Sequence, residues 1–335
     1  MGGRIKRDEL DRIAATYALD APAVDAMLDA AAARPGTEAQ REFFARCARY
    51  GGILSLAAGI VFFVAANWGR IAVFGRFALL ELLLLAFMGV ALAKPPPRFV
   101  GRAALFLAFV VTGALLALFG QTYQTGADVY ELFLTWSLLG LPLVLLARWG
   151  VASAAWVVVF NTALLLYCGW RPAGGLLWAL FDNGWFAGYA VLVSAALNLA
   201  LWLAFEKLEW SAVPDWVRRL IVTCGMAFVT WAGITGVEGS ELIAFSGRAQ
   251  PPSAAWAYLL MTAVAVVTVL RRRDVYPLAL AMASFILVSL CWIPKGVGGS
   301  DAGTVFAMAL WLIATSGVAG RVLLTLMRRW RAVPA

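Results

Sequence analysis

Long apolar runs alternate with short polar segments from about residue 51 to residue 331. A transmembrane helix needs roughly 20 largely apolar residues, within a range of about 17 to 25. Ten runs meet this requirement; nine or eleven remain alternatives, because the limits of the fifth and sixth can shift. The predicted spans are 51–67, 77–93, 103–120, 130–147, 151–169, 184–205, 218–236, 253–270, 276–293 and 304–326. The pattern predicts an all-α polytopic membrane protein with about ten transmembrane helices.

Residues 1–50 are rich in charge and predict a small helical unit in the cytoplasm. A first helix is expected around Leu10 and Ile13, and a second one restarts at Asp20. Thr37 followed by Gln40 has the spacing of a capping box, which opens a helix that continues into the first span. We therefore expect two domains, the unit 1–50 and a transmembrane bundle over 51–331.

The basic residues are concentrated in alternate loops, on one predicted side of the membrane. With the amino terminus in the cytoplasm, 22 of the 27 Lys and Arg residues fall on the cytoplasmic side. The outer loops keep Arg70, Arg76, Arg171, Arg248 and Lys295. This asymmetry follows the positive-inside rule and predicts that both termini are cytoplasmic. The net charge of +8 therefore reports topology, with attraction to anionic lipid as a second effect, and no nucleic-acid partner is expected.

The composition limits the kinds of functional site that the chain is expected to contain. With 63% hydrophobic and 14% charged residues, the chain suits the lipid bilayer as its main solvent. It has no histidine, and its four cysteines lack metal-binding spacing, so we expect no metal and no cofactor. A disulfide between Cys168 and Cys291 is left open. Tryptophans at span ends, such as Trp149, are expected to anchor in the headgroup layer.

Few polar residues lie at membrane depth, where an unsatisfied polar group is costly. Glu81 is the only carboxylate firmly inside a predicted span. It either reaches the interface and meets Arg76, or serves a functional site. Asn161 and Asn198 are expected to hydrogen-bond across helices.

A polar segment lies between the third and fourth predicted spans. Residues 120–136 hold two carboxylates, two amides, three threonines, two tyrosines and no basic residue. An ordinary external loop would also be polar. The sharper hypothesis is an outward-facing polar vestibule, built from spans one to four, that binds a small ligand or lipid group. Its predicted residues are Asn67, Trp68, Glu81, Gln121, Tyr123, Gln124, Thr125, Asp128, Glu131 and Trp136.

Two stretches carry a resemblance to a known family. One runs from Tyr50-Gly-Gly-Ile-Leu to Ala66-Asn67-Trp68, and the other from Gly120-Gln-Thr-Tyr-Gln-Thr-Gly to Thr135-Trp136. Over about residues 1–170, the chain resembles the bacterial predicted membrane proteins grouped as domain of unknown function 2157. The resemblance implies a bacterial inner-membrane protein of unassigned activity. Similar proteins often occur beside other membrane proteins, which implies an assembly.

The leading functional expectation is a non-enzymatic subunit of an inner-membrane assembly, with other inner-membrane proteins as partners. The main alternative is a secondary transporter or channel that uses Glu81, Asp128 and Glu131 as cation or proton sites. An intramembrane transferase is disfavoured, because the chain lacks histidine and clustered external arginines.

The charge asymmetry generates a labelling prediction. In spheroplasts, a cysteine introduced as Gly126→Cys should react with an impermeant thiol reagent, whereas Pro96→Cys should react only after permeabilisation. Cysteine-free protein carrying each single substitution supplies the background. The opposite labelling pattern would reverse the orientation.

Overall fold

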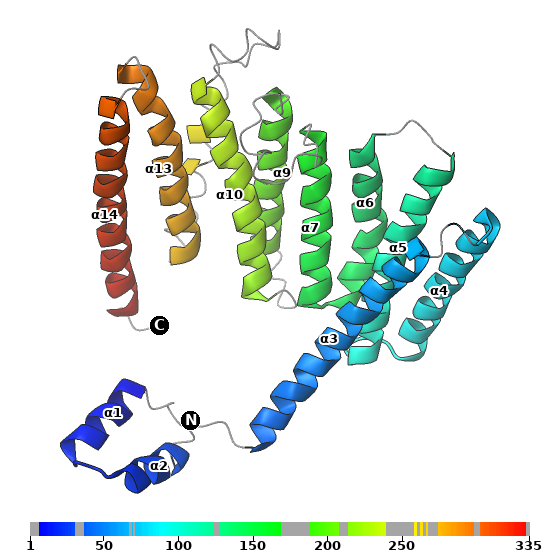
Figure 1. The fold of residues 1–335 in the computed structure, drawn as a ribbon, viewed down its shortest axis with the longest axis horizontal. Helices are drawn as coiled ribbons and strands as arrows, with labels where there is room; N and C mark the ends of the chain where they lie inside the picture. Colours follow the sequence, from blue (N-terminus) through cyan, green and yellow to red (C-terminus); the bar gives the residue numbers. More distant parts are fainter. Residues whose placement is uncertain are drawn as a thin grey trace. The chain divides into compact units, whose positions relative to one another are not determined.

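Helices dominate the described part of the chain in the computed structural model (Figure 1). The described residues contain no strand, so the predicted all-α class is confirmed. They are residues 7–30, 37–66, 69, 71–123, 128–168, 188–207, 214–238, 258, 259, 262, 263, 266, 274–297 and 302–332.

Two compact units divide the chain, Met1–Ile71 and Ala72–Ala335. The first holds α1 (Arg7–Thr16), α2 (Ala21–Ala30) and α3 (Thr37–Ala66). Asp20 Oδ1 accepts a hydrogen bond of 3.0 Å from Ala23 N and caps α2, as the sequence predicts. Because α3 runs unbroken from Thr37 to Ala66, no break in the helix marks the domain boundary predicted at residue 50. That boundary stays a prediction about where the chain enters the membrane.

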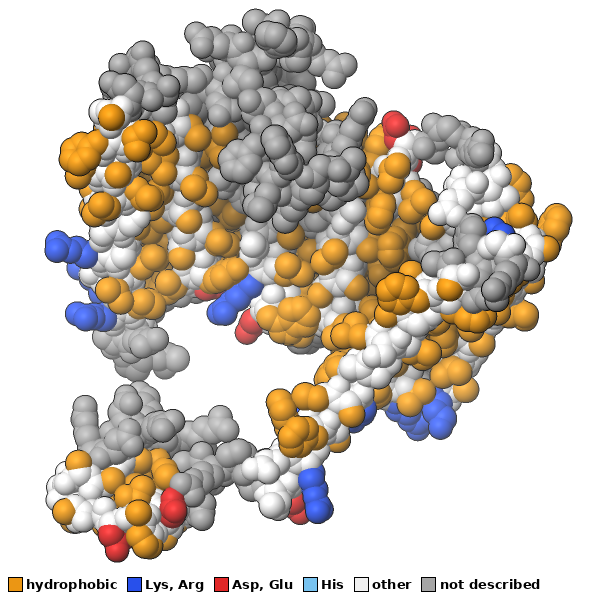
Figure 2. Space-filling model, in the orientation of Figure 1, with side chains coloured by type: hydrophobic (Ala, Val, Ile, Leu, Met, Phe, Trp, Pro, Cys, Tyr) orange, Lys and Arg blue, Asp and Glu red, His pale blue; other side chains and the backbone are white. Residues whose placement is uncertain are grey.

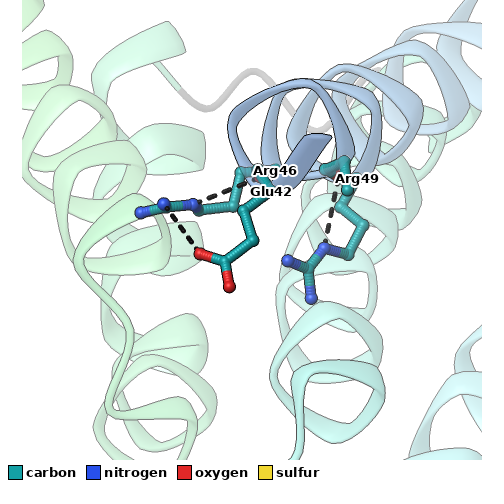
Figure 3. A network of polar contacts seen from close by, with 4 residues as sticks. Glu42, Arg46 and Arg49 are labelled. Carbon is teal, nitrogen blue, oxygen red and sulfur yellow. Dashed lines mark hydrogen bonds and ion pairs between the residues drawn. The ribbon is translucent and has the colours of Figure 1, made fainter. Parts of the chain in front are cut away.

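The polar first part of α3 bonds along its own surface (Figure 3). Arg46 Nη2 lies 3.5 Å from Glu42 Oε2, and Arg49 Nε donates to Ala45 O at 3.2 Å. The Arg46–Glu42 pair is largely exposed, and exposed pairs of this kind are worth roughly 0.2–1 kcal/mol. These contacts are therefore local, and the apolar run that begins at residue 51 carries the helix toward the bilayer.

The second unit contains eight long helices in its described part. Each helix packs against the next one in the order given below, and α10 packs against α7 as well. The helices are α4 (Val73–Ala93), α5 (Phe99–Tyr123), α6 (Val129–Ala147), α7 (Gly150–Tyr167), α9 (Gly188–Lys207), α10 (Asp215–Glu238), α13 (Val275–Val297) and α14 (Ala302–Ala332).

Seven helices of the described residues are long and apolar enough to cross a membrane, and two shorter apolar helices are Ala190–Phe205 and Val275–Cys291. These nine fall on nine of the ten predicted spans. The tenth, 253–270, lies mostly outside the described residues. The polytopic architecture is confirmed, and the count of ten is met in part.

α10 and α13 run in the same direction. Near their starts, the hydroxyls of Thr223 and Tyr276 share a hydrogen bond of 2.7 Å. About two turns further along both helices, Thr230 Oγ1 donates to Ser284 Oγ at 2.8 Å. α13 therefore begins at the same end of the second unit as α10.

Aromatic rings of α5 and α6 interlock over two glycines. Phe109 of α5 packs directly on Gly140 of α6, and Trp136 of α6 packs directly on Gly113 of α5. The two rings stack with centroids 5.2 Å apart, and Trp136 Nε1 donates to Phe109 O at 2.9 Å. A Cβ atom at either glycine would collide with the opposing ring. These small residues therefore set the close approach of the two helices.

Polar side chains link the next helices in the same way. Trp156 Nε1 of α7 donates to Ser137 O of α6 at 2.7 Å. Asn198 Nδ2 of α9 donates to Asn161 Oδ1 of α7 at 2.9 Å, and both side chains are buried. The bond across helices predicted for this asparagine pair is thereby confirmed.

Two expectations change. Trp149 is only 7% exposed, because the edges of Phe99 and Phe106 pack around it, so it is a core residue and the headgroup anchor predicted for it is wrong. All four cysteines are free thiols, so Cys168 and Cys291 form no disulfide.

The interlock of α5 and α6 generates a stability prediction. Gly113→Leu should lower the midpoint of thermal unfolding by several degrees, because the new side chain must displace the Trp136 ring. Trp136→Phe should cost less, about 1 kcal/mol, since it removes one interhelical hydrogen bond. Gly89→Leu on α4 is the matched control, since no heavy atom lies within 4 Å of a Cβ built there. Equal melting of the Gly113→Leu and Gly89→Leu variants would contradict the interlock.

Candidate functional site

Several predicted site residues gather at one end of the second unit. The start of α4, the end of α5 and the start of α6 share this end, since consecutive helices turn back on each other. Gln121 and Tyr123 lie in the last turn of α5, and Asp128 and Glu131 lie at the start of α6. We call this end, over these four residues, the outer end, after the orientation that the sequence predicts.

Tyr123 joins an aromatic cluster between α4 and α5. Its ring centroid lies 6.3 Å from that of Phe77 on α4 and 4.8 Å from that of Phe119 on α5. The side chain is still 58% exposed. Tyr123 therefore combines a packed ring with an accessible hydroxyl.

The two carboxylates of the outer end stand at the amino terminus of α6. Asp128 is the extended residue before the helix, and its backbone oxygen accepts a 3.0 Å bond from Glu131 N. Tyr130 OH donates to Glu131 Oε1 at 3.4 Å, and the Tyr130 ring meets that of Tyr167 on α7 at 5.3 Å. Both carboxylates are exposed. The positive end of the helix dipole stabilises negative charge at this position, which accounts for them without a ligand.

Glu81 lies deeper along α4. It is the ninth residue of that helix, about 12 Å along the axis from Val73 at 1.5 Å per residue. The residue before it, Leu80, is fully buried, whereas Glu81 itself is exposed. Glu81 thus points away from the helices that pack on α4 within the second unit.

Trp136 has a packing role. Its indole N–H donates a hydrogen bond to Phe109 O, and its ring stacks on the Phe109 ring and covers Gly113. Asn67, Trp68, Gln124 and Thr125 lie outside the described residues. The described part of the vestibule is therefore Gln121, Tyr123, Asp128 and Glu131, with Glu81 on the adjoining face of α4.

At the opposite end, the structure contains a feature that hydropathy does not reveal. A cavity of about 1000 Å³ lies where the α4–α5 turn, the α6–α7 turn and the start of α10 come together, and Arg102 and Arg148 line it. The only sequence signals are the turn at Pro95–Pro97 and one isolated arginine in each neighbouring segment.

Basic side chains cluster at this same end. Figure 2 shows blue side chains near these helix ends and a largely orange surface along the sides of the helices. Among the described residues, no group of three or more His, Cys, Asp or Glu side chains could hold a metal ion.

Comparison with known proteins gives one match. No curated protein and no solved structure is significantly similar to the chain. Residues 3–153 match the family described as "Predicted membrane protein (DUF2157)". The match confirms the resemblance found in the sequence and covers α1 to the start of α7. The amino-terminal part of this chain is therefore similar to the DUF2157 family of predicted membrane proteins, and further apolar helices follow it.

Proposed function

We propose that the chain is a non-enzymatic subunit of a membrane assembly, and that the exposed face of α4 is where a partner helix docks. The observation that carries the proposal is Glu81, an exposed carboxylate within a 21-residue apolar helix. A charged side chain facing lipid costs at least about 2.5 kcal/mol near the bilayer centre. A polar group from a partner removes much of that cost.

The surroundings of Glu81 suit a helix. Phe74, Leu85 and Leu92 are 84%, 67% and 79% exposed. With Glu81, they follow one another at intervals of seven, four and seven residues, which places them along one face of α4. A partner helix carrying a donor at the level of Glu81 would bury this stripe. The outer end, with Tyr123, Asp128 and Glu131, adjoins it and is the proposed place for a small ligand or lipid group.

The proposed setting is a bacterial inner membrane with both termini in the cytoplasm. The excess of basic residues in alternate loops supports this orientation. The outer end then faces away from the cytoplasm. In a transporter, the carboxylates that bind the ion would have to line a path at membrane depth. Asp128 and Glu131 lie at the end of a helix instead, which favours the subunit over the transporter alternative.

Glu81→Leu should lower recovery of the partner about tenfold in mild-detergent purification with mass spectrometry, a loss of about 1.4 kcal/mol. Glu81→Gln should lose less, because the amide keeps a hydrogen-bonding oxygen. Glu131→Leu is the matched control, since that carboxylate is exposed at the helix end.

A photo-crosslinking residue in place of Leu85 should capture another membrane protein. The same residue in place of Ile313, 70% exposed on α14, is the control for lipid-facing positions. Crosslinks only to α3 of the same chain would mean that the chain covers Glu81 itself, which contradicts the proposal. A single-chain particle that moves a solute across liposomes, and does so less well as Glu81→Gln, would establish the transporter alternative.

A further inference from the structure

The cavity at the end of the second unit opposite the outer end has a lining that is apolar except for two arginines. Two of its fourteen lining residues are basic, none is acidic, and the rest are apolar or glycine. A ligand that fits such a lining carries a negative group and a substantial apolar part.

Arg102 provides a positive charge that can bind the negative group of such a ligand. It lies in the first turn of α5, and its Nε atom is buried without a hydrogen-bond partner. A buried donor left unpaired costs about 1–3 kcal/mol, and more when it belongs to a charged group. Such a donor is normally satisfied by water or a ligand. An anion in the cavity would satisfy it.

Arg148 supplies the second charge. It connects α6 to α7 and holds a left-handed backbone conformation with φ 44°, which is unusual for a residue other than glycine. No carboxylate of the described residues forms an ion pair with Arg102 or Arg148. Two planar guanidinium groups that form no ion pair with a described carboxylate favour a phosphate, whose oxygens accept paired N–H bonds.

The helix dipoles beside the cavity largely offset each other. α7 and α10 begin next to lining residues, whereas α4 and α6 end next to others. A helix start carries about half a positive charge and a helix end about half a negative one. The arginines therefore supply the positive charge of the cavity.

The apolar wall decides between a free anion and a lipid. Leu92, Leu145 and Leu146 project from α4 and α6 into a cavity of about 1000 Å³, far more room than a phosphate ion fills. Leu92 and Leu146 are 79% and 61% exposed, so the wall continues onto the lipid-facing surface. Basic pockets between transmembrane helices are a known form of phospholipid headgroup site.

We propose that this cavity binds one anionic phospholipid, with its phosphate on Arg102 and Arg148 and its acyl chains along Leu92, Leu145 and Leu146. The site shares only Leu92 with the partner face around Glu81 on α4, and its two arginines do not depend on that proposed function.

Native mass spectrometry of the delipidated full-length protein tests this. Phosphatidylglycerol and phosphatidylcholine with identical acyl chains are added separately. The wild type should retain one phosphatidylglycerol at least about tenfold more strongly than phosphatidylcholine, because only the first carries net negative charge. Arg102→Gln combined with Arg148→Gln should abolish this preference. Arg98→Gln combined with Arg329→Gln should leave it unchanged, since both arginines are exposed and neither lines the cavity.

A second variant keeps the test decisive if the double arginine variant fails to fold. Leu146→Trp narrows the cavity with both charges intact and should weaken phosphatidylglycerol retention several-fold. Equal retention of the two lipids by the wild type would overturn the proposal, as would equal loss in the control pair. Competition by inorganic phosphate at concentrations similar to the lipid would also overturn it, because the site would then recognise the anion alone.

Discussion

The second unit depends on one constraint, that a polar side chain within an apolar helix must find its hydrogen-bond partner inside the protein. Trp136 bonds α6 to α5, and Trp156 bonds α7 to α6. Asn198 bonds α9 to α7, Thr230 bonds α10 to α13, and Trp311 bonds α14 to Ser289 of α13. Close packing at small residues such as Gly113 and Gly140 acts together with these polar bonds to determine which helix faces meet.

Hydropathy was sufficient to place the helices, and it succeeded for a physical reason. Lipid offers the backbone no hydrogen bonds, so each apolar run long enough to cross must become a helix. The start of α3 at Thr37 was predicted from a local signal, and hydrogen bonding across helices by Asn161 and Asn198 was predicted because a buried amide has few possible partners. That the two bond to each other was not predicted. The α1–α2 break at Asp20 followed from the same kind of local signal.

The sequence did not predict the directions in which the side chains point. Trp136 belongs to a polar stretch and was predicted to line a vestibule, but its place over Gly113 depends on the rotation of α6 against α5. Trp149 sits at a helix start, as a headgroup anchor would, and is buried by Phe99 and Phe106. The Arg102–Arg148 cavity joins segments more than forty residues apart, so no local pattern announces it. The predicted vestibule residues Gln121, Tyr123, Asp128 and Glu131 share one end of the second unit because the order of the helices brings them there.

Some polar groups of the second unit are not part of this hydrogen-bond network, and the volume of the space beside them differs. Asn198 Oδ1 is buried and unpaired, and the cavity that Asn198 lines measures about 20 Å³, room for a single water. Arg102 Nε is also unpaired, but it belongs to a residue that lines about 1000 Å³ with apolar walls. Glu81 borders an open helix face. The volume beside each group therefore sets what could reach it. The space at Asn198 is too small for a lipid or a helix, whereas the proposed phospholipid and the proposed partner helix follow from the larger space beside Arg102 and from the exposed face around Glu81.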